Sequence, residues 1–235
     1  MYKEGTYFSD NKRHLEDSDY KVDAILRVLN PLLDKHDIKI HSYADVGCGA
    51  GGVLKGISQA FQKNGRKISE VKGYDVSPHV NDMEVEGVVF NHGDFIEIGT
   101  DADLITLTDV FEHVPDPVGF IREVSKKGKI IAFHIPLDDC LSVNLRNLQR
   151  YKIQNPGHLI FLNVNSALNM VTMAGLQILD YDFSKETISA PSNNQTFLQK
   201  LFSPIKRVMF FLNPWIYTKI FGFSLVVVAK SNQMD

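Results

Sequence analysis

The sequence predicts an α/β fold built on a doubly wound, mostly parallel sheet of seven strands with helices on both faces. One observation is that short apolar runs, typical of buried strands, alternate along the chain with amphipathic stretches that favour helices. The other is that 235 residues, 44% of them hydrophobic and 23% charged, are enough for one domain with a substantial core.

The expected strands are short and rich in apolar residues, and they cover residues 41–47, 70–76, part of 85–93, 102–110, 129–137, 176–183 and 223–230. The helices expected between them cover residues 51–63, 117–126 and 165–174. A further helix is expected from Asp19 to about His36, and Pro31 inside it is expected to kink or split it.

The order of these elements suggests an N-terminal lid and helix over residues 1–38 and one α/β domain over residues 39–235. Two connections in the domain, about 138–164 and 184–222, are long for links between neighbouring elements. Both insertions can reach the crevice beyond the carboxyl ends of the strands, where sheets of this kind bind ligands, or cover a sheet edge.

Charge and cysteine content argue against several classes of function. A net charge of −3 argues against a nucleic-acid partner, which usually meets a basic excess. Cys48 and Cys140 lie far apart without a CxxC pair, so neither a disulfide framework nor a metal site is expected. Few cysteines and no apolar N-terminal stretch suit a reducing cytoplasm.

The glycine-rich stretch DVGCGAGG lies between the first expected strand and the helix after it. Glycines let the chain turn tightly, and the following helix N-terminus offers backbone donors to a ligand. Gly47, Gly49 and Gly52 also satisfy GxGxxG, the dinucleotide spacing, so an NAD-dependent oxidoreductase is one alternative. A tight turn without a ligand is the other.

Acidic residues near three strand ends favour a different nucleoside ligand. Asp45 suits a ligand that carries an ammonium or a sulfonium better than a pyrophosphate. Asp75 ends the second strand, where a carboxylate accepts hydrogen bonds from ribose hydroxyls. Asp94 follows the third strand and can accept from an adenine amino group, while Phe95 can cover a base face.

Four motifs, DVGCGAG (45–51), GYDVS (73–77), GDF (93–95) and DVFEHVPDP (109–117), occur in this order. Over about residues 40–185 the chain thereby resembles the class I S-adenosylmethionine-dependent methyltransferases, in particular the small-molecule branch that includes the ubiquinone-biosynthesis type. The resemblance implies a Rossmann-like methyltransferase fold with a C-terminal antiparallel hairpin, and S-adenosyl-L-methionine as cofactor.

Carried over by position, the resemblance also implies a set of cofactor-binding residues. The glycines would approach the methionine part, Asp45 its amino group, Asp75 the ribose, and Asp94 with Phe95 the adenine. The implied cofactor-binding residues are Asp45, Gly47, Gly49, Gly51, Asp75, Val76, Asp94, Phe95, Thr108, Asp109 and His113.

Methyl transfer to a hydroxyl needs alignment and a general base. His134, at the end of the fifth strand, is one candidate, and a histidine packed under the insertion is an equal interpretation. His158 and the loop acid Asp138 are the other candidates. Asp138 could orient a histidine or bind substrate hydroxyls, and a solvated loop acid without a function is an equal interpretation. Relatives from bacterial surface-polysaccharide gene clusters look similar across HIPLD and GHLIF, which favours both histidines.

Two segments, one basic and one rich in aromatic and basic residues, could contribute to binding of the acceptor. Arg146, Arg150 and Lys152, expected on one helix, could hold an acidic or phosphorylated group, or simply face solvent. Residues 197–222 combine aromatic and basic side chains, which is typical of a cap, a homodimer contact or a peripheral membrane anchor.

The sequence therefore favours O-methylation of a sugar or other small polar metabolite, with surface-glycan biosynthesis as the expected context. A phosphate-bearing or lipid-linked acceptor is the nearest alternative. A binding protein without turnover is another, and it would bind the cofactor alone. The (N/D/S)PPY motif of amino methylation is replaced by TDVFEHVP, which disfavours nitrogen acceptors.

Overall fold

A computed structural model describes residues 18–188 and 197–232, and a seven-stranded sheet forms its centre. The strands are β1 (Ser42–Val46), β2 (Glu70–Asp75), β3 (Val89–His92), β4 (Ala102–Thr108), β5 (Gly128–Leu137), β6 (Leu176–Phe183) and β7 (Phe223–Ser231). Their order across the sheet is β3-β2-β1-β4-β5-β7-β6. Only β7 runs antiparallel to its neighbours, so the doubly wound sheet and its C-terminal hairpin are both confirmed.

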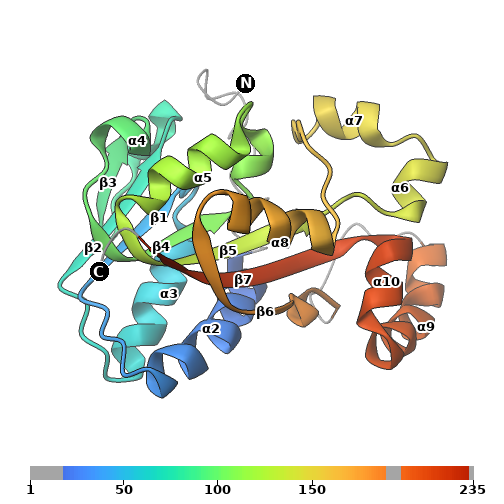
Figure 1. Cartoon of the computed structure of the whole chain (residues 1–235), viewed down its shortest axis with the longest axis horizontal. Helices are drawn as coiled ribbons and strands as arrows, with labels where there is room; N and C mark the ends of the chain where they lie inside the picture. The colour runs from blue at the N-terminus through green and yellow to red at the C-terminus, as the bar shows by residue number, and fades with distance from the viewer. Residues whose placement is uncertain (1–17, 189–196, 233–235) are drawn as a thin grey trace.

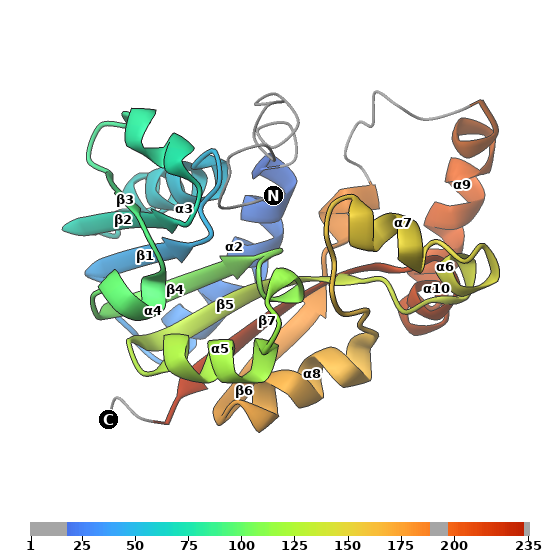
Figure 2. The same ribbon diagram turned by 90° about the horizontal axis from the view of Figure 1, so that it is seen from above.

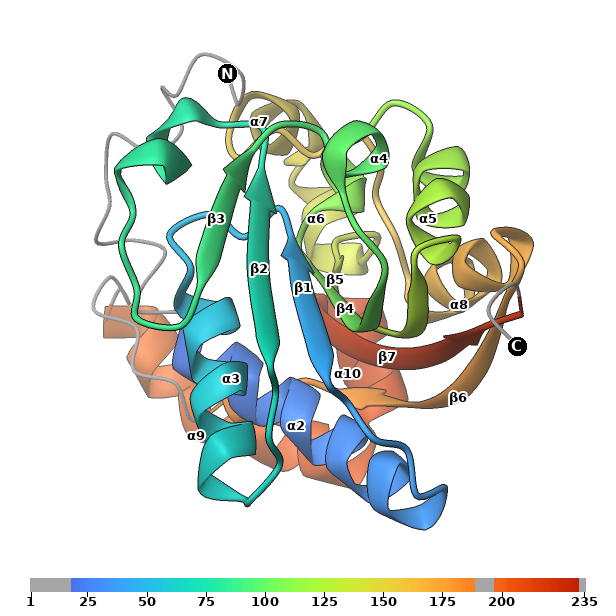
Figure 3. The same ribbon diagram turned by 90° about the vertical axis from the view of Figure 1, so that its left-hand side faces the viewer.

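Helices cover both faces of this sheet (Figure 1). The α-helices are α2 (Ser18–Lys35), α3 (Gly52–Lys63), α4 (Phe95–Ile98), α5 (Pro117–Ser125), α6 (Leu141–Leu145), α7 (Gln149–Gln154), α8 (Val164–Met173), α9 (Phe197–Leu212) and α10 (Pro214–Phe221). The short 3-10 helices are η2 (Pro78–Asp82), η3 (Phe111–His113) and η4 (Lys185–Ile188). Figure 3 shows α2 and α3 on one side of the strands and α4, α5 and α8 on the other.

The core consists of two layers separated by the sheet. Leu104 of β4 packs with α2 and α3, whereas Ile105 and Leu107 pack with α5 and α8. Strands buried on both faces need apolar residues at nearly every position, which explains the unbroken apolar runs in the sequence.

Helix α2 runs without a break through Pro31, so the expected split does not occur. The proline removes one backbone donor from the helix interior. Ile25, Leu29 and Leu33 are almost fully buried in the layer below the sheet, and this packing offsets the lost hydrogen bond.

The two insertions meet at one end of the molecule. The first carries α6 and α7, the second carries η4, α9 and α10, and α10 lies against α6 (Figure 2). The expectation of a single basic helix over 144–152 was wrong. Two short helices, α6 and α7, occur instead, and Asn147 between them adopts a left-handed φ of 50°. No helix within the described residues is both long and apolar enough to cross a membrane.

Candidate functional site

A cavity of about 810 Å³ opens beyond the carboxyl ends of β1, β2 and β4. Its walls are the glycine loop, the start of α4, the loop around η3 and one end of α2. The first insertion contributes Pro156 and His158. The cavity thus lies where the order of strands reverses, the position at which sheets of this class bind ligands.

The glycine loop lines the cavity mainly with backbone. Gly47 has a φ of 72°, and a Cβ built on it would lie 2.6 Å from a methyl carbon of Val110. The N–H groups of Gly47 and Cys48 both donate to the carbonyl of Tyr74, at 2.8 and 3.0 Å, which ties the loop to β2. Gly51 is not among the lining residues; it precedes α3 with a φ of 73°.

Asp45 is a buried acid at the wall of the cavity. It is 1% exposed, and its Oδ1 accepts a 2.6 Å hydrogen bond from the hydroxyl of Thr106. Burial raises the pKa of Asp45 to about 7. The hydrogen bond from Thr106 lowers this pKa, and the charge of Asp75 raises it further. A cationic ligand beside it would favour the ionised carboxylate.

Asp75 organises the loop from the end of β2. Its Oδ2 accepts from the N–H of Gly49 at 2.9 Å, and its Oδ1 accepts from the N–H of Ser77 at 2.8 Å. A carboxylate has about four acceptor positions in all, so Asp75 retains acceptors for a ligand hydroxyl. Val76 also lines the cavity.

Asp94 and Phe95 lie at the start of α4 and line the cavity. Asp94 is exposed, and its Oδ1 caps the helix by accepting from the N–H of Ile96 at 2.9 Å. The Phe95 ring is 2% exposed and packs edge-on against Tyr74, with 4.9 Å between centroids. Phe95 therefore contributes to the core as well as to the cavity wall.

Thr108 ends β4 and Asp109 follows it, and both residues line the cavity. The Thr108 hydroxyl is buried and finds no hydrogen-bond partner among the described residues. Asp109 has a φ of 53°, and its Oδ2 lies 2.8 Å from the amino group of Lys21. Although burial opposes ionisation, the charges of Lys21 and then His134 lower the pKa of Asp109 well below its usual range.

His134 lies beneath Asp109 and is not among the residues that line the cavity. Its side chain is 1% exposed, Nδ1 donates to Oδ1 of Asp109 at 2.7 Å, and Nε2 lies 3.2 Å from the hydroxyl of Ser184. Both ring nitrogens are thus occupied by protein partners. The structure places His134 as a support for Asp109.

His158, by contrast, lines the cavity. Its Nδ1 donates to Oδ2 of Asp138 at 2.7 Å, and Lys152 holds both oxygens of the same carboxylate at 2.9 Å. Although burial opposes ionisation, the hydrogen bonds from His158 and Lys152 lower the pKa of Asp138. A ring that donates through Nδ1 to an ionised carboxylate presents the lone pair of Nε2. The exposed Arg146 and Arg150 lie outside this group.

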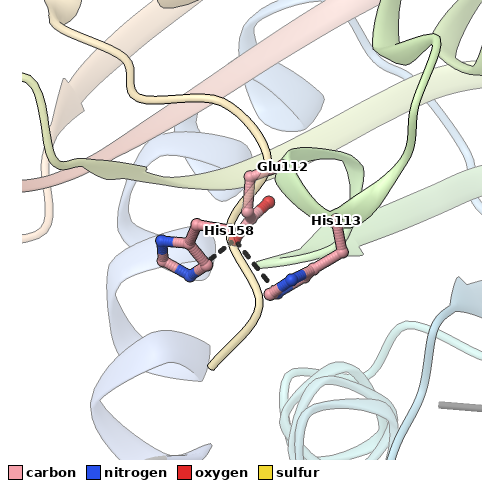
Figure 4. Close-up of side chains that lie close together, drawn as sticks. All are labelled: Glu112, His113 and His158. Atoms are coloured by element: carbon pink, nitrogen blue, oxygen red, sulfur yellow. Dashed lines mark ion pairs between the residues drawn. The ribbon is translucent and has the colours of Figure 1, made fainter. Parts of the chain in front are cut away.

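Glu112 and His113 of η3 complete the site. Oε1 of Glu112 lies 3.9 Å from Nε2 of His113 and 4.0 Å from Nε2 of His158, and Figure 4 shows the three side chains together. Sequence reasoning missed Glu112, although an acid inside the apolar stretch VFEHV was a usable signal. It also missed Lys21, because nothing in the pattern of α2 distinguishes that residue from a surface lysine.

Comparison with known proteins gives a family and a fold. The sequence matches a family described as a methyltransferase domain over residues 14–181. No curated protein matches it.

Solved structures are similar at low sequence identity. A methyltransferase of Haloferax volcanii, in complex with the Trm112 methyltransferase activator, is 14% identical with a TM-score of 0.63, over 96% of this chain and 95% of that one. Magnesium protoporphyrin IX methyltransferase from Synechocystis, with bound SAH, is 13% identical with a TM-score of 0.57, over 96% and 91%. A SAM-dependent methyltransferase from Archaeoglobus fulgidus is 19% identical with a TM-score of 0.57, over 96% and 99%.

Proposed function

The chain belongs to the methyltransferase-domain family and is an S-adenosylmethionine-dependent methyltransferase, and we propose that it methylates a hydroxyl oxygen of a sugar or another small polar molecule. The observation that carries the proposal is the composition of a single cavity. The glycine loop with Asp45 and Asp75 lines the same cavity as His113 and His158, and we assign the first group to the cofactor end and the second group to the acceptor end.

The residues at the first end fit S-adenosylmethionine. Asp45 is a buried acid suited to the methionine amino group, and Asp75 retains acceptors for the ribose hydroxyls. The buried Thr108 hydroxyl has no partner in the described part of the chain and faces the same space. When bound, the cofactor supplies a methyl group on a positively charged sulfur, which leaves as a neutral thioether.

The second end supplies the groups that act on the acceptor. We assign the activation of the acceptor oxygen to His158, whose Nε2 lone pair is directed by the hydrogen bond to Asp138. His134 is assigned a positioning role, since it holds Asp109 from below. Lys21 holds the other oxygen of Asp109. Lys21 and Asp109 together form a polar wall of the cavity that an acceptor can contact.

A small polar acceptor is supported by this wall, because carboxylates and imidazoles bind sugar hydroxyls readily. One observation favours a lipid-linked acceptor as a second candidate. Helices α9 and α10 expose Phe211, Leu212 and Ile216, which are 73%, 80% and 53% exposed, and the same helices carry Lys206, Arg207 and Lys219. An amphipathic surface of this kind binds lipid head groups and acyl chains.

A screen for released S-adenosylhomocysteine tests the proposal. The wild-type chain is incubated with S-adenosylmethionine and panels of sugars, sugar nucleotides and lipid-linked sugars. Turnover of a hydroxyl acceptor, lost in His158→Gln, is expected. Calorimetric binding of NADH in place of S-adenosylhomocysteine would contradict it.

A further inference from the structure

We propose that Glu112, His113 and His158 form a binding site for a divalent transition-metal ion, such as Mn²⁺ or Zn²⁺, at the acceptor end of the cavity. The site itself stands on geometry; its role in catalysis rests on the proposed function. Two imidazoles and one carboxylate are a ligand set that first-row divalent ions use when they keep open positions for a substrate.

Both imidazoles are already arranged as ligands. Nδ1 of His113 donates to the carbonyl of Gly157 at 2.9 Å, and Nδ1 of His158 donates to Asp138 at 2.7 Å. Each ring therefore carries its lone pair on Nε2, the atom nearest Glu112. A carbonyl or carboxylate behind the far nitrogen is the usual support of a metal-binding histidine, because it fixes the tautomer and the ring orientation.

The carboxylate between the two rings has no hydrogen-bond partner in the described part of the chain. Glu112 is 1% exposed, and neither of its oxygens accepts a hydrogen bond from a described residue. The nearby lysines pair with other acids, Lys21 with Asp109 and Lys152 with Asp138. A buried carboxylate without donors is costly, and a bound cation removes that cost.

The distances suit a cation after a small adjustment. The ligand atoms of the three residues lie within 4.8 Å of one another. Metal–nitrogen bonds of about 2.0–2.1 Å place neighbouring ligands roughly 3 Å apart, so the ligand atoms need to approach one another by roughly 1–2 Å. Glu112 and His113 share η3, and the backbone N–H of Leu159 donates to the carbonyl of Glu112 at 2.8 Å. That bond ties the His158 loop to η3 and keeps the three ligands together.

A cation here would act on the acceptor. His113 and His158 line the cavity, so the open positions of the ion face the acceptor. A hydroxyl bound to the ion has a lowered pKa and loses its proton to solvent. The oxygen–methyl bond then forms as the sulfur–methyl bond breaks, and the bonding pair stays on sulfur. This changes the role of His158. Its Nε2 lone pair would bind the ion, and the proton of the acceptor hydroxyl would go to solvent and not to His158.

No metal site was expected from the sequence, because its two cysteines form no metal-binding pattern and the ligands proposed here are a glutamate and two histidines. The ligands come from two segments that are far apart in the chain. Only the fold, which brings the loop before α8 against η3, places them together.

Direct measurement of metal binding tests the site without reference to activity. The full chain, purified without a histidine tag and stripped with EDTA, is titrated with Mn²⁺ and, separately, with Zn²⁺ by calorimetry. One ion per chain is expected, and Glu112→Gln should weaken its affinity by about 100-fold or more. His36→Ala, which removes an exposed imidazole outside the cavity, should leave the affinity unchanged.

The Glu112→Gln variant keeps the size of the side chain, and S-adenosylhomocysteine affinity reports whether its cavity is intact. Absence of stoichiometric binding to the wild-type chain, or equal affinities in wild type and Glu112→Gln, would overturn the site. Full turnover in EDTA would overturn its catalytic role while methyl transfer itself stands. Metal binding without any S-adenosylhomocysteine binding would instead contradict the proposed function and support the site.

Discussion

Oδ2 of Asp138 accepts a 2.7 Å hydrogen bond from Nδ1 of His158, and this contact turns the other ring nitrogen toward the cavity. Lys152 holds the same carboxylate at 2.9 Å and keeps it ionised. The orientation of His158 therefore depends on a residue that does not itself line the cavity.

Asp138→Asn tests this dependence. An amide can donate to Nδ1, which favours the wrong tautomer, so we expect kcat to fall by about 10- to 100-fold and Mn²⁺ affinity to fall by a similar factor. S-adenosylhomocysteine affinity should change little. The matched control is Asp139→Asn, whose carboxylate binds Asn144 and Asn163 instead. Equal kcat in wild type and Asp138→Asn would count against the orienting role.

The two candidate histidines are separated by one pair of variants. His158→Gln should lower kcat by about 100-fold or more, the usual contribution of a group that activates an oxygen. His134→Gln keeps hydrogen-bonding capacity beneath Asp109 and should retain turnover within about 10-fold, provided that it folds. Steady-state rates of S-adenosylhomocysteine release decide between them, and the reverse order would assign the base to His134.

Asp75→Ala should weaken S-adenosylhomocysteine binding by about 10- to 100-fold, the scale of one or two charge-assisted hydrogen bonds. Part of the loss comes from the loop, because the N–H groups of Gly49 and Ser77 lose their acceptor. Calorimetry gives the affinity, and thermal unfolding shows whether the variant is folded. An unchanged affinity would remove Asp75 from the cofactor site.

A pair of glycine variants tests the close approach of the loop. Gly47 and Gly87 have φ values of 72° and 76°, so an alanine at either position costs about 1–2 kcal/mol of backbone strain. Only at Gly47 would the new Cβ also meet Val110, at 2.6 Å, since nothing lies within 4 Å at Gly87. We expect Gly47→Ala to lose cofactor binding and Gly87→Ala to keep it. Equal affinities would show that the loop backbone is not at the ligand.

The pH dependence of cofactor binding follows from Asp45. Burial raises the pKa of Asp45 from 3.8 to about 7 in the free protein, and the ionised form is the one that attracts an ammonium group. S-adenosylhomocysteine affinity should therefore fall as the pH is lowered from 8 to 6, by at most about 10-fold per pH unit below that pKa. Calorimetry across this range should show the slope in wild type and a flatter profile in Asp45→Asn.

Much of the fold was predictable because buried strands and amphipathic helices leave periodic patterns in the sequence. The strand ends also placed Asp45, Asp75 and Thr108 at one edge, since parallel strands bring their carboxyl ends together. The expectation that His134 ends its strand was wrong, because β5 continues along β7 to Leu137, and the His134 ring is buried beneath Asp109.

Contacts between loops that are distant in the sequence could not be predicted from hydrophobic periodicity or from the positions of strand ends. Glu112 meets His158 only because the first insertion folds back onto η3. Lys21 reaches Asp109 from α2, and helical periodicity predicts which face of α2 is buried but not which acid a lysine contacts. Ring orientation likewise depends on Asp138 and Gly157, which no local pattern relates to the histidines.

A crystal structure of the chain with S-adenosylhomocysteine would show whether the cofactor occupies this cavity. We expect the amino acid part to lie along the glycine loop beside Asp45, the ribose to contact Asp75, and the sulfur to face His113 and His158. A ligand bound elsewhere, or a sulfur that faces away from both histidines, would contradict this expectation.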